Sequence, residues 1–212
     1  MKCVIFAGGE SVKKDVIDYD FLDNAYVISA DKGYELATSL DIKTNLLIGD
    51  FDSIDKVPND VLNKTFPCEK DDTDLMLAVK EGLAVGCSDF IIYGATGGRL
   101  DHMLGNIQCL MYLRNHDANA TIISDTEYVK LLSPGKYRIK HKKDHSLSLI
   151  AYSSKVTDLC ISGTKYETTN CTLENSFPLG ISNEIISEDG YATVEFKAGI
   201  LLVIQSYLYT KF

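Results

Sequence analysis

The arrangement of apolar residues changes near residue 127, and this change constrains the fold more than any other feature of the sequence. Before it, short β-branched runs alternate with longer segments of helical spacing, which is typical of a parallel sheet covered by helices on both faces. After it, short alternating segments are separated by turn residues, which indicates an antiparallel β-sandwich or barrel. The sequence therefore predicts an α/β protein with an N-terminal α/β domain over residues 1–130 and a C-terminal β domain over residues 131–212.

The best-defined predicted helix covers residues 73–86, where Leu75, Val79 and Leu83 recur every fourth residue and Gly86 can end the helix. A second helix is predicted over residues 100–114. Strands are predicted over residues 3–7, 25–29, 45–48, 90–93 and 120–123 of the first domain, and over residues 137–140, 146–152, 160–162, 192–196 and 200–206 of the second.

The charge of the chain is negative and unevenly distributed. The formal net charge is −9, and residues 1–135 hold 22 of the 30 acids but only 12 of the 21 bases. Such a chain should repel nucleic acid and anionic membrane surfaces, so we expect neither among its partners. The basic run over residues 136–143 alternates with apolar residues and is interpreted as a solvated strand and turn.

The sequence also limits the compartment and the cysteine chemistry. The first residues form too short an apolar run for a signal peptide, and no segment has the length of a membrane span, so we expect a cytoplasmic protein. The six cysteines form no CxxC pair, which argues against a zinc site and a disulfide framework. Free, mainly buried thiols are expected.

Asp and Gly collect where a ligand would bind to the predicted sheet. Ligand sites of open parallel sheets lie beyond the carboxyl ends of the strands. The segments that follow the strands or precede the helix over 73–86 are Gly8-Gly9, residues 30–33 (Ala-Asp-Lys-Gly), 49–53 (Gly-Asp-Phe-Asp-Ser), 71–74 (Asp-Asp-Thr-Asp) and 94–102 (Gly-Ala-Thr-Gly-Gly-Arg-Leu-Asp-His).

Carboxylates crowded at one edge of a sheet repel one another unless a cation compensates them, and oxygen ligands without His or Cys suit Mg²⁺. Glycines let backbone N–H groups approach phosphate oxygens, and Arg99 adds a fork-shaped donor. These parts indicate a Mg²⁺-nucleotide enzyme that transfers a phosphorus group. Each acidic residue also has a purely structural interpretation. Asp50 and Asp52 could form a turn, and Asp72 or Thr73 could cap the helix. Asp74 could lie in the first turn because the helix dipole favours an anion there.

Four of these segments, at residues 30–33, 49–53, 71–74 and 94–102, form an ordered series of motifs. Together with Asn106 and a Ser-Asn-Glu segment at 182–184, they resemble the motifs of bacterial thiamine pyrophosphokinases across most of the chain. The resemblance implies Mg²⁺-dependent transfer of the terminal pyrophosphate of ATP to the hydroxyl of thiamine, which gives thiamine diphosphate and AMP. It also implies a homodimer with the thiamine site near the subunit interface.

The resemblance further implies roles for individual residues. The candidates for the catalytic carboxylate that accepts or orients the hydroxyl proton are Asp74 and Asp101, with Asp71 as a further catalytic candidate. The predicted metal ligands are Asp50, Asp52 and Asp74, with Asp71 and Asp72 as further candidates. The predicted nucleotide-binding residues are Asp31, Lys32, Gly97, Gly98, Arg99, His102 and Asn106. The predicted thiamine-binding residues are Asp101, Ser182 and Asn183.

Two features depart from the family pattern. Lys32 stands where the family's ADGG motif has its first Gly, and a lysine there would be strained if the position required a positive φ. We expect instead that its ammonium lies near the nucleotide or a neighbouring carboxylate. The chain also has no Trp to stack on thiamine, so Tyr166 or Phe177 could substitute, although a core role is an equal expectation for each.

His102 has two interpretations. It could bind phosphate, or it could cap the helix or brace Asp101.

Two other functions fit parts of the pattern. The Asp50-x-Asp52 pair resembles the nucleophile pair of aspartyl-phosphate phosphatases, but those enzymes place it after their first strand and here it follows the third. A module that binds a cation or a nucleotide without turnover would share the same residues.

Overall fold

The computed structural model describes residues 1–49, 61–66 and 71–208 of the chain. The chain divides into two compact units, Met1–Asp125 and Thr126–Phe212. Strand β7 (Glu127–Leu132) lies wholly in the second unit because it pairs with β13 (Leu201–Tyr207) of that unit, whereas the boundary expected at residue 130 would divide it. No helix in the described ranges is long and apolar enough to cross a membrane.

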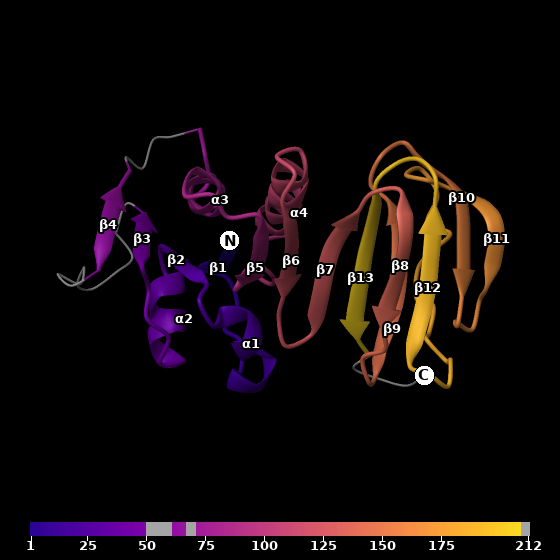
Figure 1. The fold of residues 1–212 in the computed structure, drawn as a ribbon, viewed down its shortest axis with the longest axis horizontal. Helices are drawn as coiled ribbons and strands as arrows, with labels where there is room; N and C mark the ends of the chain where they lie inside the picture. The colour runs from indigo at the N-terminus through magenta and orange to yellow at the C-terminus, as the bar shows by residue number, and fades with distance from the viewer. Residues whose placement is uncertain (50–60, 67–70, 209–212) are drawn as a thin grey trace. The chain divides into compact units, whose positions relative to one another are not determined.

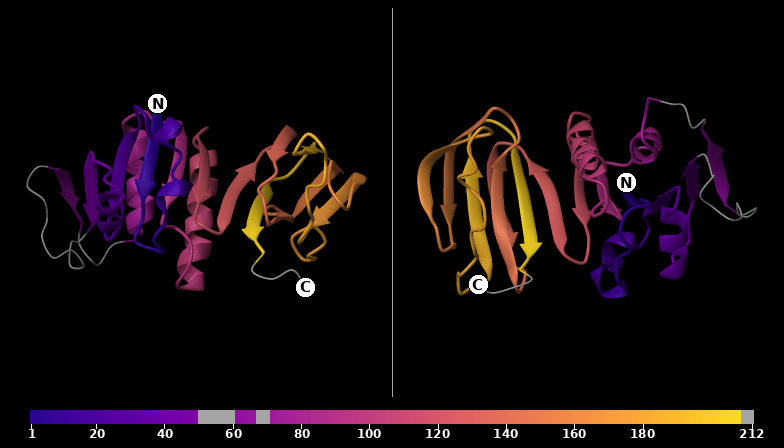
Figure 2. Two further views of the ribbon diagram at one scale, coloured as in Figure 1. Left: turned by 90° about the horizontal axis from the view of Figure 1, so that it is seen from below. Right: turned by 180° about the vertical axis from the view of Figure 1, so that it is seen from behind.

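The first unit is built on a parallel sheet in the order β4-β3-β2-β1-β5-β6 (Figure 1). Its strands are β1 (Lys2–Phe6), β2 (Tyr26–Ala30), β3 (Leu46–Gly49), β4 (Leu62–Thr65), β5 (Asp89–Tyr93) and β6 (Asn119–Ile123). Its helices are η1 (Lys14–Val16), α1 (Tyr19–Leu22), α2 (Gly33–Ser39), α3 (Asp74–Ala84) and α4 (Leu100–Arg114). In Figures 1 and 2, α1 and α2 cover one face of the sheet, and α3 and α4 cover the other. The predicted parallel sheet with helices on both faces is confirmed.

The order of the strands creates a crevice at β1 and β5. The chain runs outward from β1 through β2 and β3 to β4, then returns to place β5 on the other side of β1. At such a reversal the loops beyond two adjacent strands leave in opposite directions and open a ligand crevice. Phe6 and Tyr93, which are register partners at the ends of β1 and β5, stack with ring centroids 5.5 Å apart beneath this crevice.

The two predicted helices form close to the expected bounds. Thr73 caps α3, since its side-chain oxygen accepts a hydrogen bond from the backbone N–H of Met76 at 3.2 Å. Gly86 follows that helix with a φ of +86°, a conformation that favours glycine. Helix α4 begins and ends at the predicted residues.

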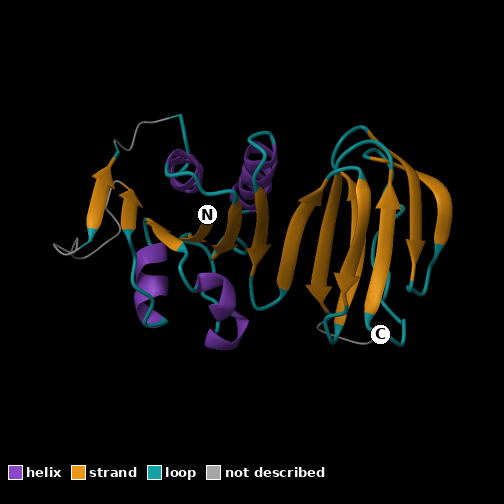
Figure 3. Cartoon of the chain, in the orientation of Figure 1, coloured by secondary structure: helices purple, strands orange, loops and turns teal. Residues whose placement is uncertain are grey.

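The second unit is a sandwich of two antiparallel sheets, in the orders β7-β13-β9 and β11-β10-β12-β8. Its remaining strands are β8 (Gly135–Lys140), β9 (His145–Ala151), β10 (Lys155–Ser162), β11 (Thr168–Glu174) and β12 (Tyr191–Phe196). Figure 3 shows strands and loops in the described part of this unit. Buried side chains from both sheets, including Leu147, Val156, Leu159 and Leu201, form one core between them. Of the two forms expected, the sandwich is the one that occurs.

In the described part of the chain, three strands and three helices lie outside the sequence predictions. The strands are β4, β7 and β11, and the helices are η1, α1 and α2. All four residues of β4 are exposed, so the strand lacks the buried apolar run that identifies the other parallel strands. Among the described cysteines, Cys3, Cys87 and Cys109 are buried and Cys160 and Cys171 are partly exposed, and all five are free thiols, as expected.

Candidate active site

The loops after β1 and β5 lie against each other at the crevice. The backbone N–H of Gly9 donates to the carbonyl of Gly94 at 2.7 Å, and the N–H of Glu10 donates to the carbonyl of Thr96 at 3.2 Å. A Cβ atom on Gly9 would lie only 2.4 Å from the oxygen of Gly94. The close backbone contact therefore requires glycine at position 9, and it fixes one wall of the site.

A pocket of about 540 Å³ opens beside these loops. It is lined by the loops after β1, β2 and β5, the residues at the start of α3, and the first turns of α4. Eight of the predicted site residues line it, namely Asp31, Asp74, Gly97, Gly98, Arg99, Asp101, His102 and Asn106. Asp72 also lines it, whereas Lys32 and Asp71 are not among its lining residues. The predicted metal ligands Asp50 and Asp52 lie outside the described residues.

The backbone resolves the question raised by Lys32. Lys32 has φ −54° and ψ −15°, an ordinary helical conformation, so the strain that a positive φ would cause is absent. The left-handed conformation occurs one residue earlier, at Asp31, whose φ is 48°. Asp tolerates this region better than most residues. Glycine is needed at position 33 instead, because a Cβ atom there would lie 1.9 Å from the carbonyl oxygen of Phe6.

The acids at the start of α3 have different surroundings. The carboxylate of Asp72 forms an ion pair with Lys80 at 2.6 Å, and this hydrogen bond raises the pKa of Lys80 above its usual value. Asp74 occupies the first turn of the helix, where the dipole favours an anion, and lines the pocket. Lys80 thus compensates the charge of Asp72. Within the described ranges, no group of three or more His, Cys, Asp or Glu residues is placed to hold a metal.

Arg99 and Asp101 bind each other at the start of α4. Arg99 donates from Nε to Oδ1 of Asp101 at 3.0 Å and from Nη2 to Oδ2 at 2.5 Å. Asp101 also accepts a hydrogen bond from the backbone N–H of His102 at 3.0 Å. The Arg99 hydrogen bonds are the main cause that lowers the pKa of Asp101 to about 2. The predicted phosphate donor and the predicted proton acceptor therefore occupy each other when no ligand is bound.

His102 and Asn106 continue the same helix. The amide of Asn106 donates to the carbonyl of Ala95 at 2.8 Å and so ties α4 to the loop over residues 94–98. His102 lines the pocket, and its backbone N–H braces Asp101. This hydrogen bond comes from the backbone, so the two interpretations of the His102 side chain, phosphate binding or support of Asp101, stay predictions. The ring is left with a position at the pocket wall.

The Ser-Asn-Glu segment belongs to the second unit and has a structural role there. Asn183 is only 7% exposed. Its Oδ1 accepts from the backbone N–H groups of Tyr166 and Glu184, at 3.0 and 2.9 Å. Its Nδ2 donates to the carbonyl of Tyr166 at 2.8 Å and to Oγ1 of Thr164 at 3.2 Å. The Asn183 amide is thus used by the protein, and it holds the backbone of Tyr166 in place.

The aromatic residues considered for thiamine are on the surface. Tyr166 is 64% exposed and Phe177 is 65% exposed, so a core role is wrong for both. Ser182, which adjoins Asn183, has a φ of 58° and donates its backbone N–H to Oγ of Ser148 at 3.1 Å.

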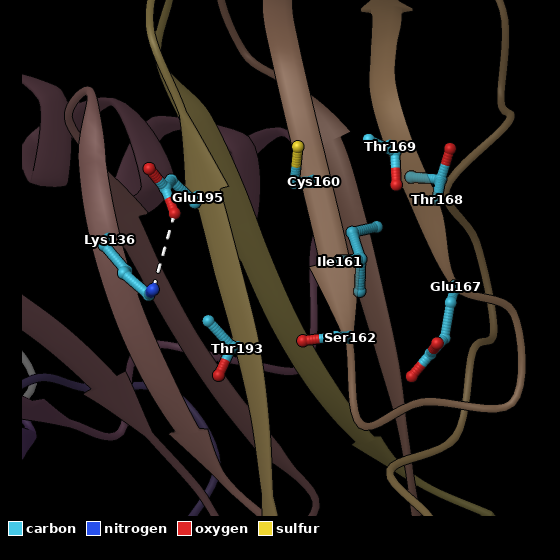
Figure 4. A pocket seen from close by; sticks show the side chains of 9 residues that line it. All are labelled: Lys136, Cys160, Ile161, Ser162, Glu167, Thr168, Thr169, Thr193 and Glu195. Atoms are coloured by element: carbon cyan, nitrogen blue, oxygen red, sulfur yellow. Dashed lines mark ion pairs between the residues drawn. The ribbon is translucent and has the colours of Figure 1, made fainter.

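A second pocket, of about 560 Å³, lies on strands β8, β12, β10 and β11 (Figure 4). Lys136 and Glu195 form an ion pair across it at 3.6 Å, and the other lining groups are mostly hydroxyls such as Thr193 and Ser162. Arg138 on the same strand pairs with Asp189 at 2.7 Å. The bases of β8 are exposed and alternate with half-buried Tyr137 and buried Ile139, and a turn follows, so the interpretation of residues 136–143 as a solvated strand and turn is confirmed. This pocket has no glycine loop, and its acids, Glu167 and Glu195, already have partners in the backbone N–H of Gly163 and in Lys136.

Comparison with known proteins assigns the family. The family model described as "Thiamin pyrophosphokinase, catalytic domain" matches residues 20–122. The one described as "Thiamin pyrophosphokinase, vitamin B1 binding domain" matches residues 136–201. The thiamine pyrophosphokinase of Bacillus subtilis is 32% identical over 210 residues, which cover 96% of this chain and 97% of that protein.

Solved structures agree. A crystal structure of thiamine pyrophosphokinase from Bacillus subtilis matches with a TM-score of 0.85 and 30% identity, covering 98% of this chain and all of that one. One from Geobacillus thermodenitrificans matches with a TM-score of 0.82 and 27% identity over the full length of both chains. With three of its predicted motifs lining one pocket, those at 30–33, 71–74 and 94–102, and with family models matching both of its units, the chain belongs to the thiamin pyrophosphokinase family.

Proposed function

We propose that this protein is a thiamine diphosphokinase that transfers the terminal pyrophosphate of ATP to the hydroxyl of thiamine and releases AMP. The observation that carries the proposal is the pocket at the ends of β1 and β5, where glycine loops and acidic side chains meet in a chain of this family. Transfer of a phosphorus group depends mainly on alignment of the reactants and on compensation of the phosphate charge, and this pocket contains groups for both.

The nucleotide phosphates are assigned to the loop over residues 94–98 and to Arg99. Gly97 and Gly98 adopt φ values of +76° and +67°, which favour glycine. The Glu10 side chain lies against Gly97, whereas a Cβ atom on Gly98 would have no neighbour within 4 Å. Helix α4 starts directly after this loop, and the N–H groups at a helix start favour anions. Binding of phosphate would draw Arg99 away from Asp101. Asp31 and Lys32 are assigned to the neighbourhood of the nucleotide.

The described residues suit Mg²⁺ in their donor chemistry. Asp74 brings a carboxylate to the pocket, and Mg²⁺ commonly binds through one or two carboxylates and completes its shell with substrate phosphates and water. Asp74 would hold the ion together with Asp50 and Asp52, whose assignment stays a prediction from the sequence. Bound there, the ion would compensate negative charge on the transferred group.

Asp101, one of the candidate bases, has a partner in the ligand-free chain. The Arg99 guanidinium binds its carboxylate and lowers its pKa to about 2. A permanently ionised carboxylate suits contact with the positively charged thiamine. We therefore assign orientation of the hydroxyl proton to Asp74, or to Asp71 beside it, and contact with thiamine to Asp101.

The second unit is assigned to thiamine binding and dimerisation. Its match to the vitamin B1 binding domain supports this role, and Tyr166 and Phe177 offer exposed rings in a chain without Trp. Ser182 and Asn183 would act mainly by shaping the loop that carries Tyr166. A homodimer with the thiamine site near the subunit interface, and a cytoplasmic location, stay predictions.

Product analysis distinguishes this function from the alternatives. The protein is incubated with ATP, Mg²⁺ and thiamine, and the products are followed by phosphorus NMR. Thiamine-dependent AMP and thiamine diphosphate support the proposal. Formation of ADP would indicate monophosphate transfer, inorganic phosphate without thiamine dependence would indicate a phosphatase, and unchanged ATP would indicate a binding module.

A further inference from the structure

Thr96 lies at the centre of the loop between β5 and α4 and has no role in the assignments above. The residue is only 7% exposed and lines the pocket together with Gly97 and Gly98. Its backbone carbonyl is already used, since it accepts the N–H of Glu10 at 3.2 Å. The backbone of Thr96 is therefore fixed between the loops after β1 and β5.

The hydroxyl of Thr96 is buried without a hydrogen bond. Its Oγ1 is almost completely inaccessible, and no residue in the described part of the chain is its hydrogen-bond partner. A threonine hydroxyl can donate one hydrogen bond and accept others, and folded proteins rarely bury such a group unsatisfied. An exception at the wall of a binding pocket indicates that a ligand completes the site.

We propose that Thr96 is a ligand-binding residue whose hydroxyl donates a hydrogen bond to the phosphate chain of the nucleotide. The inference rests on the proposed function, which puts a nucleotide in this pocket. Because the hydroxyl is inaccessible in the ligand-free chain, it must turn about the Cα–Cβ bond to reach the pocket. Threonine has three staggered positions available for this rotation, and the backbone can stay where it is.

The phosphate chain is favoured over the adenosine because of what surrounds Thr96. Gly97 and Gly98 follow it, with Gly98 exposed, and α4, which has 15 residues, starts at Leu100. Hydrogen bonds from their N–H groups to an anionic oxygen are stronger than those to a neutral acceptor. In the ligand-free state the buried hydroxyl of Thr96 makes no hydrogen bond, which carries a desolvation penalty. Binding supplies the missing hydrogen bond, and removal of this penalty adds to the affinity.

The test compares Thr96→Val, which replaces the hydroxyl with a methyl of similar size, with Thr96→Ser, which keeps the hydroxyl. The probe is α,β-methylene-ATP with Mg²⁺, measured by titration calorimetry, because it cannot donate its pyrophosphate. Thr38→Val on α2 is the matched control, since the Thr38 hydroxyl already donates to the carbonyl of Tyr34 at 2.8 Å.

We expect Thr96→Val to raise the Kd of the analogue by about tenfold to a hundredfold, as for a lost hydrogen bond to a charged group. Thr96→Ser should stay within about threefold of the unmodified protein, and Thr38→Val should bind normally. The Tm of ligand-free Thr96→Val should be unchanged or higher, because an unsatisfied polar group is removed. Tripolyphosphate should lose affinity for Thr96→Val, whereas adenosine should not.

Several results would overturn the inference. Unchanged affinity in Thr96→Val would do so, as would a deficit confined to adenosine. A lower Tm or failure of ligand-free Thr96→Val to fold would show that the protein already uses the hydroxyl. Failure of the unmodified protein to bind the analogue would instead contradict the proposed function.

Discussion

Arg99 holds Asp101 through two hydrogen bonds at the first turn of α4, with Nε–Oδ1 and Nη2–Oδ2 distances of 3.0 and 2.5 Å. Both residues line the pocket. The predicted ligand of Arg99 is phosphate, and that of Asp101 is thiamine. The pair keeps both charges compensated in the absence of substrate. Both side chains are largely exposed, and an exposed ion pair contributes little to stability, so we expect a phosphate group to displace Asp101 from Arg99.

Replacing Asp101 with Asn should separate the two roles. The change removes the carboxylate that engages Arg99, so binding of α,β-methylene-ATP should be unchanged or tighter by a few-fold. Turnover with thiamine should fall by about a hundredfold if Asp101 contacts the substrate at the reacting end. The matched variant Arg99→Gln should weaken binding of the analogue. Weaker analogue binding in Asp101→Asn, measured by calorimetry, would contradict this account.

The pH dependence of turnover tests Asp101 further. Its folded pKa, about 2, is lowered from the usual 3.8, so the interaction with Arg99 is fully present above that ordinary value and is lost as the pH falls toward 2. Asp101 should therefore produce no change in kcat/KM between pH 5 and pH 9. An acidic limb in that range that disappears in Asp101→Asn would show that the carboxylate titrates there.

Asp72 and Asp74 provide a matched pair for the metal assignment. Asp74→Asn should lower kcat by at least about a hundredfold, because the pocket loses a carboxylate for Mg²⁺. Asp72→Asn should have a much smaller effect, since Asp72 already pairs with Lys80 at 2.6 Å. Asp50→Asn should resemble Asp74→Asn. Initial rates over a range of Mg²⁺ concentrations, with circular dichroism as the folding control, measure these effects. Normal kcat in both Asp50→Asn and Asp74→Asn would contradict the assignment.

Substitution should change the thermal stability little at Lys32 and strongly at Gly33. Lys32→Gly should leave the Tm nearly unchanged, because the backbone at Lys32 is unstrained, and should raise KM for ATP if the ammonium attracts phosphate. Gly33→Ala should destabilise the protein severely, since its Cβ would meet the carbonyl oxygen of Phe6 at 1.9 Å. Thermal unfolding measures both. A stable Gly33→Ala variant would contradict the described contact between α2 and β1.

Asn183 and Tyr166 should separate stability from binding. Asn183→Ala leaves buried backbone groups of Tyr166 without partners and should lower the free energy of unfolding by about 2 to 3 kcal/mol. Tyr166→Ala should change the unfolding free energy little, because the ring is exposed, but should raise KM for thiamine. Denaturant unfolding and initial rates measure the two effects. An Asn183→Ala variant with normal stability and a raised KM would instead make Asn183 a direct ligand.

The sequence predicted the parts of the fold and site that depend on local pattern. The helix over residues 73–86 was predictable because Leu75, Val79 and Leu83 recur on one face, and the site loops were predictable because they follow parallel strands. Strand β4 was not predictable, since its residues are exposed and it forms by pairing with β3.

The details that decide chemistry were also beyond the sequence. The positive φ considered for Lys32 occurs at Asp31, whose backbone N–H donates to the carbonyl of Ile48 at 2.7 Å, and spacing alone does not tell these two neighbours apart. The pairing of Asp72 with Lys80 depends on side-chain conformation and could not be read from spacing alone. The orphan hydroxyl of Thr96 likewise depends on packing in three dimensions.

The central claim is transfer of pyrophosphate, and a single-turnover reaction with ATP labelled at the α-phosphorus tests it most directly. With Mg²⁺ and thiamine present, all of the label should appear in AMP, in equal amount to unlabelled thiamine diphosphate, and no AMP should form without thiamine. Labelled ADP, label in the thiamine product, or AMP formation independent of thiamine would contradict the account.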